Sequence, residues 1–124
     1  MNVDNLTIGE VKALLAMFGG APAQTQQHPA IGQYVIVRCK DAGVHAGKLV
    51  SMTGRECTLE DARRLWYWKP AKGAWLDGVS LYGLHEGSKV GAMVDIRILT
   101  ENCEITVCSE LSEESIREAI DYVP

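Results

Sequence analysis

The sequence predicts an α+β protein that is mainly β: an antiparallel curled sheet or small open barrel of about six strands, with an N-terminal and a C-terminal helix. Three observations favour this class. β-branched runs dominate from residue 33 onward, short polar turns separate them, and each end of the chain carries a helix-capping pattern. A chain of 124 residues fits one domain over 1–124, with an N-terminal helix and linker at 1–32, a β-core at 33–110 and a C-terminal helix at 111–124.

The first predicted element is a short amphipathic helix over 8–18. Thr7 and Glu10 have the spacing of a capping box. The apolar residues that follow at helical spacing are Ile8, Val11, Leu14, Leu15 and Phe18. Gly19-Gly20 ends this run, and a polar linker over 21–29 leads to the β-core.

Strands are predicted at 34–39, 44–52, 55–60, 62–69, 93–99 and 103–107. Gly47 interrupts the second strand and indicates a bulge or a close backbone approach. A loop is expected over 70–78, and the pattern leaves open whether 79–84 is helix or strand. Ser112 is the predicted cap of the last helix, whose expected apolar face is formed by Ile116, Ala119, Ile120 and Val123.

Composition excludes several classes of protein. The net charge is −4 and the isoelectric point is near 5.3, which argues against a general coat on long nucleic acid. No segment approaches the ~20 apolar residues that span a bilayer, and the first residues lack a signal-peptide pattern. The four cysteines form no CxxC pair, so we expect reduced thiols in a cytoplasm.

The segment 62–69 carries the most distinctive chemistry because it holds two of the three tryptophans. As a strand, it places alternate side chains on two faces: Arg64, Trp66 and Trp68 on one, and Arg63, Leu65 and Tyr67 on the other. A guanidinium beside two indoles suits a ligand with phosphate and a flat base. The same pattern is also typical of core packing or a subunit interface, so both interpretations stay open.

No catalytic constellation is present, so we expect a protein that is not an enzyme and that needs neither a metal nor a cofactor. The turn at 87–91 is typical of a glycine turn between strands, and it also resembles an anion-binding loop in which Lys89 faces a phosphate. Arg38 and Arg97 lie within strands among apolar neighbours. Each is expected either to pair with a carboxylate or to point at a ligand.

Four stretches carry a resemblance to a known family: residues 34–38, 41–51, 61–68 and 99–105. The motifs AGVHAG and ARRLWYW are its most specific parts. Over residues 33–110 the chain resembles the first described Thoeris anti-defence proteins, which are encoded by phages. The resemblance implies a sponge that binds a cyclic ADP-ribose isomer made by bacterial TIR-domain enzymes and does not degrade it.

Some members of that family also bind cyclic di- or trinucleotides at a separate site, so these nucleotides are further candidate ligands. The resemblance implies self-association as a dimer, or as a hexamer built as a trimer of dimers, with ligand at subunit interfaces, and action in the host cytoplasm without a membrane. Combined with the chemistry of the residues, it yields nine candidate ligand contacts: Arg64, Trp66, Trp68, Arg63, Tyr82, Lys89, Arg38, His45 and Asn102. The alternative function is that of a small phage structural or assembly domain with no nucleotide ligand.

Overall fold

The computed structural model of the chain describes residues 28–124. The predicted helix over 8–18 and most of the linker lie outside the described residues. The described elements, in chain order, are β1 (Tyr34–Cys39), β2 (Gly43–Thr53), β3 (Glu56–Tyr67), α3 (Trp75–Tyr82), β4 (Lys89–Val90), β5 (Val94–Leu99), β6 (Asn102–Val107) and α4 (Glu110–Glu118).

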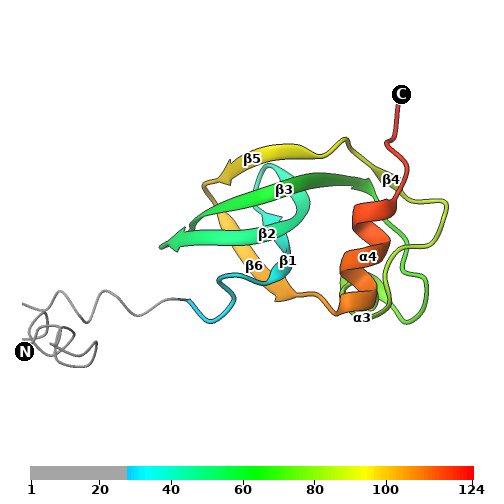
Figure 1. Cartoon of the computed structure of the whole chain (residues 1–124), viewed down its shortest axis with the longest axis horizontal. Helices are drawn as coiled ribbons and strands as arrows, with labels where there is room; N and C mark the ends of the chain where they lie inside the picture. The colour runs from blue at the N-terminus through cyan, green and yellow to red at the C-terminus, as the bar shows by residue number, and fades with distance from the viewer. Residues whose placement is uncertain (1–27) are drawn as a thin grey trace, which may run out of the picture.

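All six strands belong to one sheet, and every strand pair is antiparallel. The order is β4-β3-β2-β1-β6, and β5 joins the same edge of β3 as β4, nearer the start of that strand. Figure 1 shows the sheet curling on itself, with α3 and α4 gathered at one end. The sheet is not closed, because β5 and β6 follow each other in the chain but do not pair. The predicted fold class is therefore confirmed.

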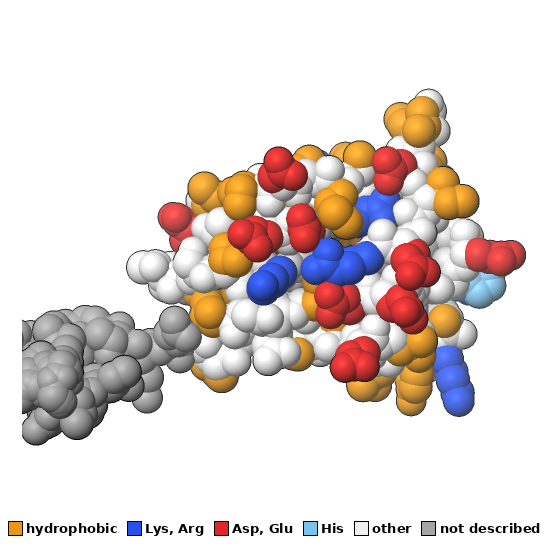
Figure 2. All heavy atoms as spheres, viewed as in Figure 1, with side chains coloured by type: hydrophobic (Ala, Val, Ile, Leu, Met, Phe, Trp, Pro, Cys, Tyr) orange, Lys and Arg blue, Asp and Glu red, His pale blue; other side chains and the backbone are white. Residues whose placement is uncertain are grey.

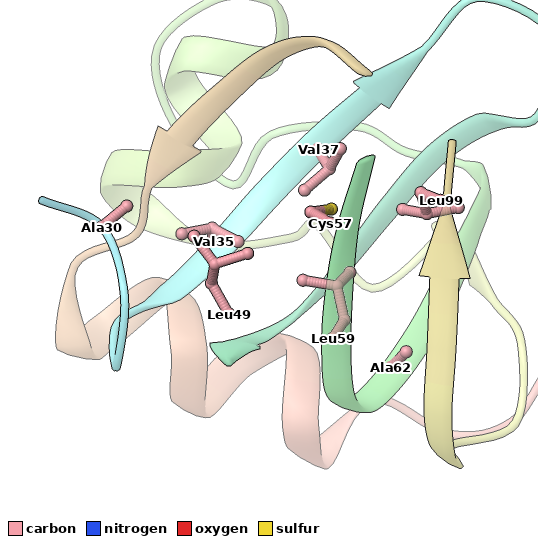
Figure 3. Close-up of a cluster of buried hydrophobic side chains, with 8 residues drawn as sticks. All are labelled: Ala30, Val35, Val37, Leu49, Cys57, Leu59, Ala62 and Leu99. Carbon is pink, nitrogen blue, oxygen red and sulfur yellow. The ribbon is translucent and has the colours of Figure 1, made fainter. Parts of the chain in front are cut away.

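One core lies inside the curled sheet. Figure 3 shows its side chains converging from β1, β2, β3 and β5. Val35 and Val37 supply the β1 part, and Leu49, Leu59 and Leu99 face them from the other strands. This inner cluster removes apolar surface from water without help from either helix.

A second core lies on the outer face of the sheet, beneath the helices. Tyr34 and Ile36 alternate with the inward valines of β1, so that all four residues are buried. Val79 of α3 and Ile116 of α4 cover this outer face. The unbroken apolar run of β1 is thus explained by a strand that is covered on both sides.

A bulge bends β3 and produces much of the curl. The register between β2 and β3 shifts at Gly47, and Asp61 has a left-handed φ of 52°. A Cβ on Gly47 would lie 2.9 Å from the backbone oxygen of Glu60, so the close approach predicted at this glycine is confirmed. The segments 55–60 and 62–69, which were predicted as separate strands, form one bent strand, β3.

The helices differ from the prediction in their bounds. α3 begins at Trp75, inside the predicted loop, and settles the undecided stretch as helix. Gly78, which the sequence places in the loop, belongs to α3, where a Cβ would lie 2.6 Å from the backbone oxygen of Lys72. The glycine therefore marks close packing and not a turn. In residues 28–124, no helix combines the length and apolar character that crossing a membrane requires.

The predicted cap of α4 was wrong by almost one turn. Ser109 is the N-cap, and its hydroxyl accepts a hydrogen bond from the backbone N–H of Ser112, which is itself buried in the helix. Because α4 already ends at Glu118, the predicted apolar face does not continue: Ile120 and Val123 are exposed.

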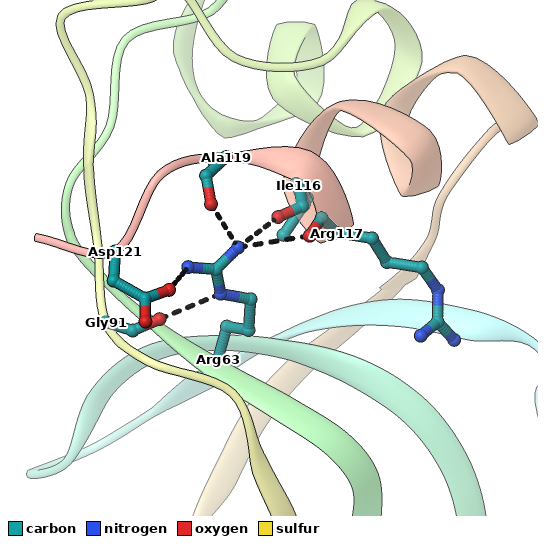
Figure 4. A network of polar contacts seen from close by, with 6 residues as sticks. All are labelled: Arg63, Gly91, Ile116, Arg117, Ala119 and Asp121. Carbon is teal, nitrogen blue, oxygen red and sulfur yellow. Dashed lines mark hydrogen bonds and ion pairs between the residues drawn. The ribbon is translucent and has the colours of Figure 1, made fainter.

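Arg63 joins α4 to the sheet through a buried guanidinium, as Figure 4 shows. It donates to the backbone oxygens of Ile116 at 2.8 Å and Ala119 at 2.7 Å, and it pairs with Asp121 at 2.6 Å. Its Nε donates to the oxygen of Gly91 at 2.8 Å. A cation at this place satisfies carbonyls that the end of a helix leaves without partners.

Replacement of Arg63 by Met should lower the free energy of unfolding by about 3 kcal/mol, because it leaves several buried acceptors without a donor. Arg38→Met is the matched control, since Arg38 forms a half-exposed pair with Glu104 and should contribute less than about 1 kcal/mol. Urea denaturation measures both. Equal losses in the two variants would contradict the assigned role.

Candidate functional site

An open groove lies beside the turn between β1 and β2, against the end of β3. Its volume is about 420 Å³, which falls within the range of small-molecule sites. We call it the Trp66 groove, and its lining residues are Asp41, Ala42, Gly43, Val44, Arg64, Leu65 and Trp66. It therefore combines parts of both motifs, AGVHAG and ARRLWYW, that the sequence singles out.

Arg64 and Trp66 form a stacked pair in this groove. The guanidinium carbon of Arg64 lies 4.9 Å from the centroid of the Trp66 ring, a cation–π distance. The indole is 60% exposed, although the strand that carries it is otherwise well packed. Gly91 backs the ring, because a Cβ there would lie 3.2 Å from the indole nitrogen. The pair thus presents a cation and an accessible aromatic surface together.

His45 is buried behind the groove, opposite Arg64 in the register of β2 and β3. Its Nε2 lies 2.8 Å from the backbone oxygen of Ala42, and its Nδ1 lies 3.3 Å from the Nη1 of Arg97. A guanidinium can only donate, so Nδ1 accepts and Nε2 carries the proton. Burial lowers the pKa of His45 to about 4, and the nearby charges of Arg64 and Arg97 act in the same direction.

Arg64 and Arg97 therefore both lie beside His45, and their positive charges act on each other. Burial and the charge of Arg64 lower the pKa of Arg97. Within residues 28–124, neither arginine forms an ion pair, and the buried Nε of Arg64 has no hydrogen-bond partner. Asp41 is the acidic member of the groove lining, and it lies beyond ion-pair distance of both. The site has an excess of positive charge that an anion would neutralise.

Another cavity, of about 290 Å³, lies between α4 and the 84–88 loop. Its charged lining includes Glu86 and Glu118, with His85 between the loop and the helix, and no Lys or Arg. A phosphorylated ligand would be repelled there. Of these two cavities, the Trp66 groove is the one whose charge suits an anion.

Several sequence candidates lie apart from the groove lining. Arg63 is buried under α4 with its donors committed to protein acceptors, so the structure gives it a structural role. Trp68 packs against the outer core, because the strand ends at Tyr67 and its alternation ends with it. Arg38 pairs with Glu104. The predicted row of three side chains is thus reduced to Arg64 and Trp66.

The remaining candidates take part in other contacts. Lys72 lies over the Tyr82 ring on α3, at 5.6 Å, and Lys89 lies over Tyr122 at 5.2 Å. The side-chain oxygen of Asn102 lies 3.5 Å from the Cys57 sulfur, within the β-core. None of Tyr82, Lys89 and Asn102 lines the Trp66 groove. Of the nine candidates, only Arg64, Trp66 and His45 come together.

Sequence reasoning did not connect Arg97 with His45, although it left two outcomes open for a mid-strand arginine. These outcomes were pairing with a carboxylate and pointing at a ligand. Arg38 pairs with the carboxylate of Glu104, whereas Arg97 contacts His45 and has no carboxylate partner among the described residues. The signal was present as an arginine among apolar neighbours, but its partner is 52 positions away. β5 pairs with β3 and not with β2, so the sequence gives no local signal for this side-chain contact.

The thiols give no sign of metal or disulfide chemistry. All four cysteines are free, and burial raises the pKa of the Cys108 thiol to about 11. Among residues 28–124, no group of three or more His, Cys, Asp or Glu side chains is arranged to hold a metal ion.

His45 should make stability depend on pH. With a pKa near 4 in the folded chain and 6.5 in the unfolded chain, the unfolded state takes up the proton first as the pH falls. Between pH 7 and pH 5 this should cost about 2 kcal/mol of unfolding free energy. His45→Gln should not show this component. Urea denaturation at several pH values gives the free energy of unfolding of the wild type and of His45→Gln. The same pH dependence in both proteins would contradict a neutral buried His45.

Figure 2 shows the face over β2, β3 and α4, where Lys and Arg side chains lie among Asp and Glu side chains. This face offers no continuous basic surface of the kind that long nucleic acid requires. In the described part of the chain, Arg64 and Arg97 are two partly buried arginines without a carboxylate partner.

Comparison with known proteins gives one match. The model of the family described as "Domain of unknown function (DUF6948)" matches residues 32–116. No curated protein and no solved structure matches the chain. The matched stretch includes the whole described sheet, both described helices except the last two residues of α4, and the Trp66 groove. The chain therefore belongs to the DUF6948 family, whose function its description leaves open.

Proposed function

We propose that this protein is a non-enzymatic sponge that binds cyclic ADP-ribose-type nucleotides in the Trp66 groove and holds them intact. Such a protein would act in the host cytoplasm against signals made by bacterial TIR-domain enzymes, as the resemblance to the Thoeris anti-defence proteins implies. The proposal does not assign a reaction, a metal or a cofactor. Binding alone lowers the concentration of free signal.

The observation that supports this proposal most is the stacked pair of Arg64 and Trp66 in an open groove. A cyclic ADP-ribose-type ligand carries both a pyrophosphate and a flat base. Arg64 can donate to the phosphate, for about 1.5–3 kcal/mol, and the exposed surface of Trp66 can stack on the base, for about 1–3 kcal/mol. These contributions must also offset the lost freedom of the ligand.

Tight capture needs a better enclosed site than this groove provides within one chain. Trp66 stays 60% exposed, and other apolar side chains are exposed on β5, where Ile96 and Ile98 point outward. We therefore include self-association in the proposal, with a second copy closing the groove. A dimer is the simplest such assembly, and a trimer of dimers is the larger form that the resemblance implies.

Calorimetric titration with cyclic ADP-ribose isomers, followed by heat denaturation and analysis of the released nucleotide, tests the proposal. We expect sub-micromolar binding of at least one isomer and its recovery unchanged. Cyclic di- and trinucleotides should be titrated in parallel, alone and after saturation with the preferred isomer. Chemically altered nucleotide would contradict the sponge, as would the absence of heat with every ligand.

Variants locate the binding site. Trp66→Ala and Arg64→Gln should each weaken binding by about 1–3 kcal/mol, through loss of the stack or of a charge-assisted hydrogen bond. Trp75→Ala is the matched control, because Trp75 is the more exposed tryptophan and lies on α3, outside the groove. Equal weakening by Trp75→Ala would place the site elsewhere.

A second candidate function is that of a small phage structural or assembly domain. Apolar side chains exposed around the junction of α3, β6 and α4 favour it: Leu81, Val107 and Leu111. The hydroxyl of Ser109 donates to the oxygen of Leu81 at 2.8 Å, which holds this junction together. This function predicts a stable assembly that binds no nucleotide, so the same titration separates the two candidates.

A further inference from the structure

We propose that Arg64 and Arg97 together form a binding site for a phosphate-type anion, set at the inner side of the Trp66 groove, with the anion held between the two guanidinium groups. The inference deepens the proposed function, since it names the part of the ligand that is held there, the phosphate group, and a further residue, Arg97, that holds it. It also stands without that function, because any phosphate or pyrophosphate group has the required chemistry.

The first support is the absence of a protein counter-ion. Within residues 28–124, each of Arg38, Arg63 and Arg117 has a carboxylate partner, at 3.3, 2.6 and 2.8 Å respectively. Arg55, Arg64 and Arg97 have none, but Arg55 is exposed and donates to the backbone oxygen of Asn102 at 3.0 Å, whereas Arg64 and Arg97 are partly buried. A partly buried arginine normally has a partner, since the loss of water around its charge is costly. Two such arginines next to the same histidine mark a place where the missing partner is a ligand.

The second support is the presence of donors that have no protein acceptor. The Nε of Arg64 is buried and has no acceptor. Arg97 uses one Nη1 hydrogen toward His45, and its other guanidinium hydrogens have no acceptor in the described part of the chain. Phosphate oxygens accept several such donors at once, and arginine is the side chain best suited to them.

The third support is that His45 holds the guanidinium of Arg97 in place without neutralising its charge. His45 is held by the Ala42 oxygen at 2.8 Å, so that its Nδ1 faces Arg97 as an acceptor. A neutral histidine fixes the guanidinium but leaves its charge uncompensated. A carboxylate in the same place would have neutralised Arg97 and competed with an anionic ligand. The Ala42 oxygen belongs to the turn that lines the groove, so this arrangement joins the anion site to the groove.

Inorganic pyrophosphate is the probe for the experiment, since it has the anionic chemistry but no base. We expect the wild-type chain to bind it and its melting temperature to rise with pyrophosphate concentration. Arg97→Gln should weaken binding by about tenfold or more. Arg38→Gln is the matched control, because it removes an exposed arginine outside the groove, and its affinity should stay within about twofold of wild type.

A second measurement separates a ligand contact from a structural residue. Without anion, Arg97→Gln should melt at the same temperature as the wild type or higher, because the substitution removes repulsion from Arg64. It should also lose most of the rise that pyrophosphate causes. A melting temperature lowered as much as in a core variant, together with unchanged pyrophosphate affinity, would overturn the proposal.

The outcome for this site and the outcome for the sponge can be told apart. Pyrophosphate binding that depends on Arg97, without binding of any cyclic nucleotide, supports the anion site and rejects the sponge. Nucleotide binding that Arg97→Gln leaves unchanged rejects the anion site and retains the sponge. No pyrophosphate binding by the wild type rejects the anion site. Trp66→Ala should affect the nucleotide and not pyrophosphate, since pyrophosphate has no base to stack.

Discussion

The buried guanidinium of Arg63 is the interaction on which the rest of the arrangement depends. It ties the last carbonyls of α4, the chain at Asp121 and the loop at Gly91 to the middle of β3. Gly91 in turn donates to the oxygen of Arg64 at 2.7 Å and backs the Trp66 ring. A structural arginine therefore positions the next residue along the strand, which faces the opposite side and has no protein partner for its charge.

The neighbouring residues Arg63 and Arg64 thus have different roles, because successive side chains of a strand point to opposite faces of the sheet. Arg63 faces the outer core and meets the negative end of a helix, whereas Arg64 faces inward to His45 and Arg97. The bulge at Gly47 and Asp61 bends β3. Arg97 of β5 contacts His45 of β2 through its side chain, although the two strands do not pair.

Much of this fold could be predicted from the sequence because strand periodicity and turn residues are local signals. The bounds of β1 and the close approach at Gly47 are examples. What could not be predicted depends on distant contacts. The pattern could not show that Arg63 meets α4, that Trp68 leaves its strand to join the outer core, or that Arg97 lies beside His45. Alternation identified the pair of Arg64 and Trp66, but not which face stays open.

The central claim is that a phosphorylated ligand occupies the groove against Trp66. NMR observation of the three indole N–H signals tests it most directly. With a cyclic ADP-ribose isomer added, the account predicts a shift of the Trp66 signal that saturates with ligand, while Trp75 on α3 does not move. Each indole N–H signal is assigned by its disappearance in the corresponding variant, Trp66→Phe or Trp75→Phe. A saturable shift at Trp75 with Trp66 unmoved, or no shift at either, would contradict it.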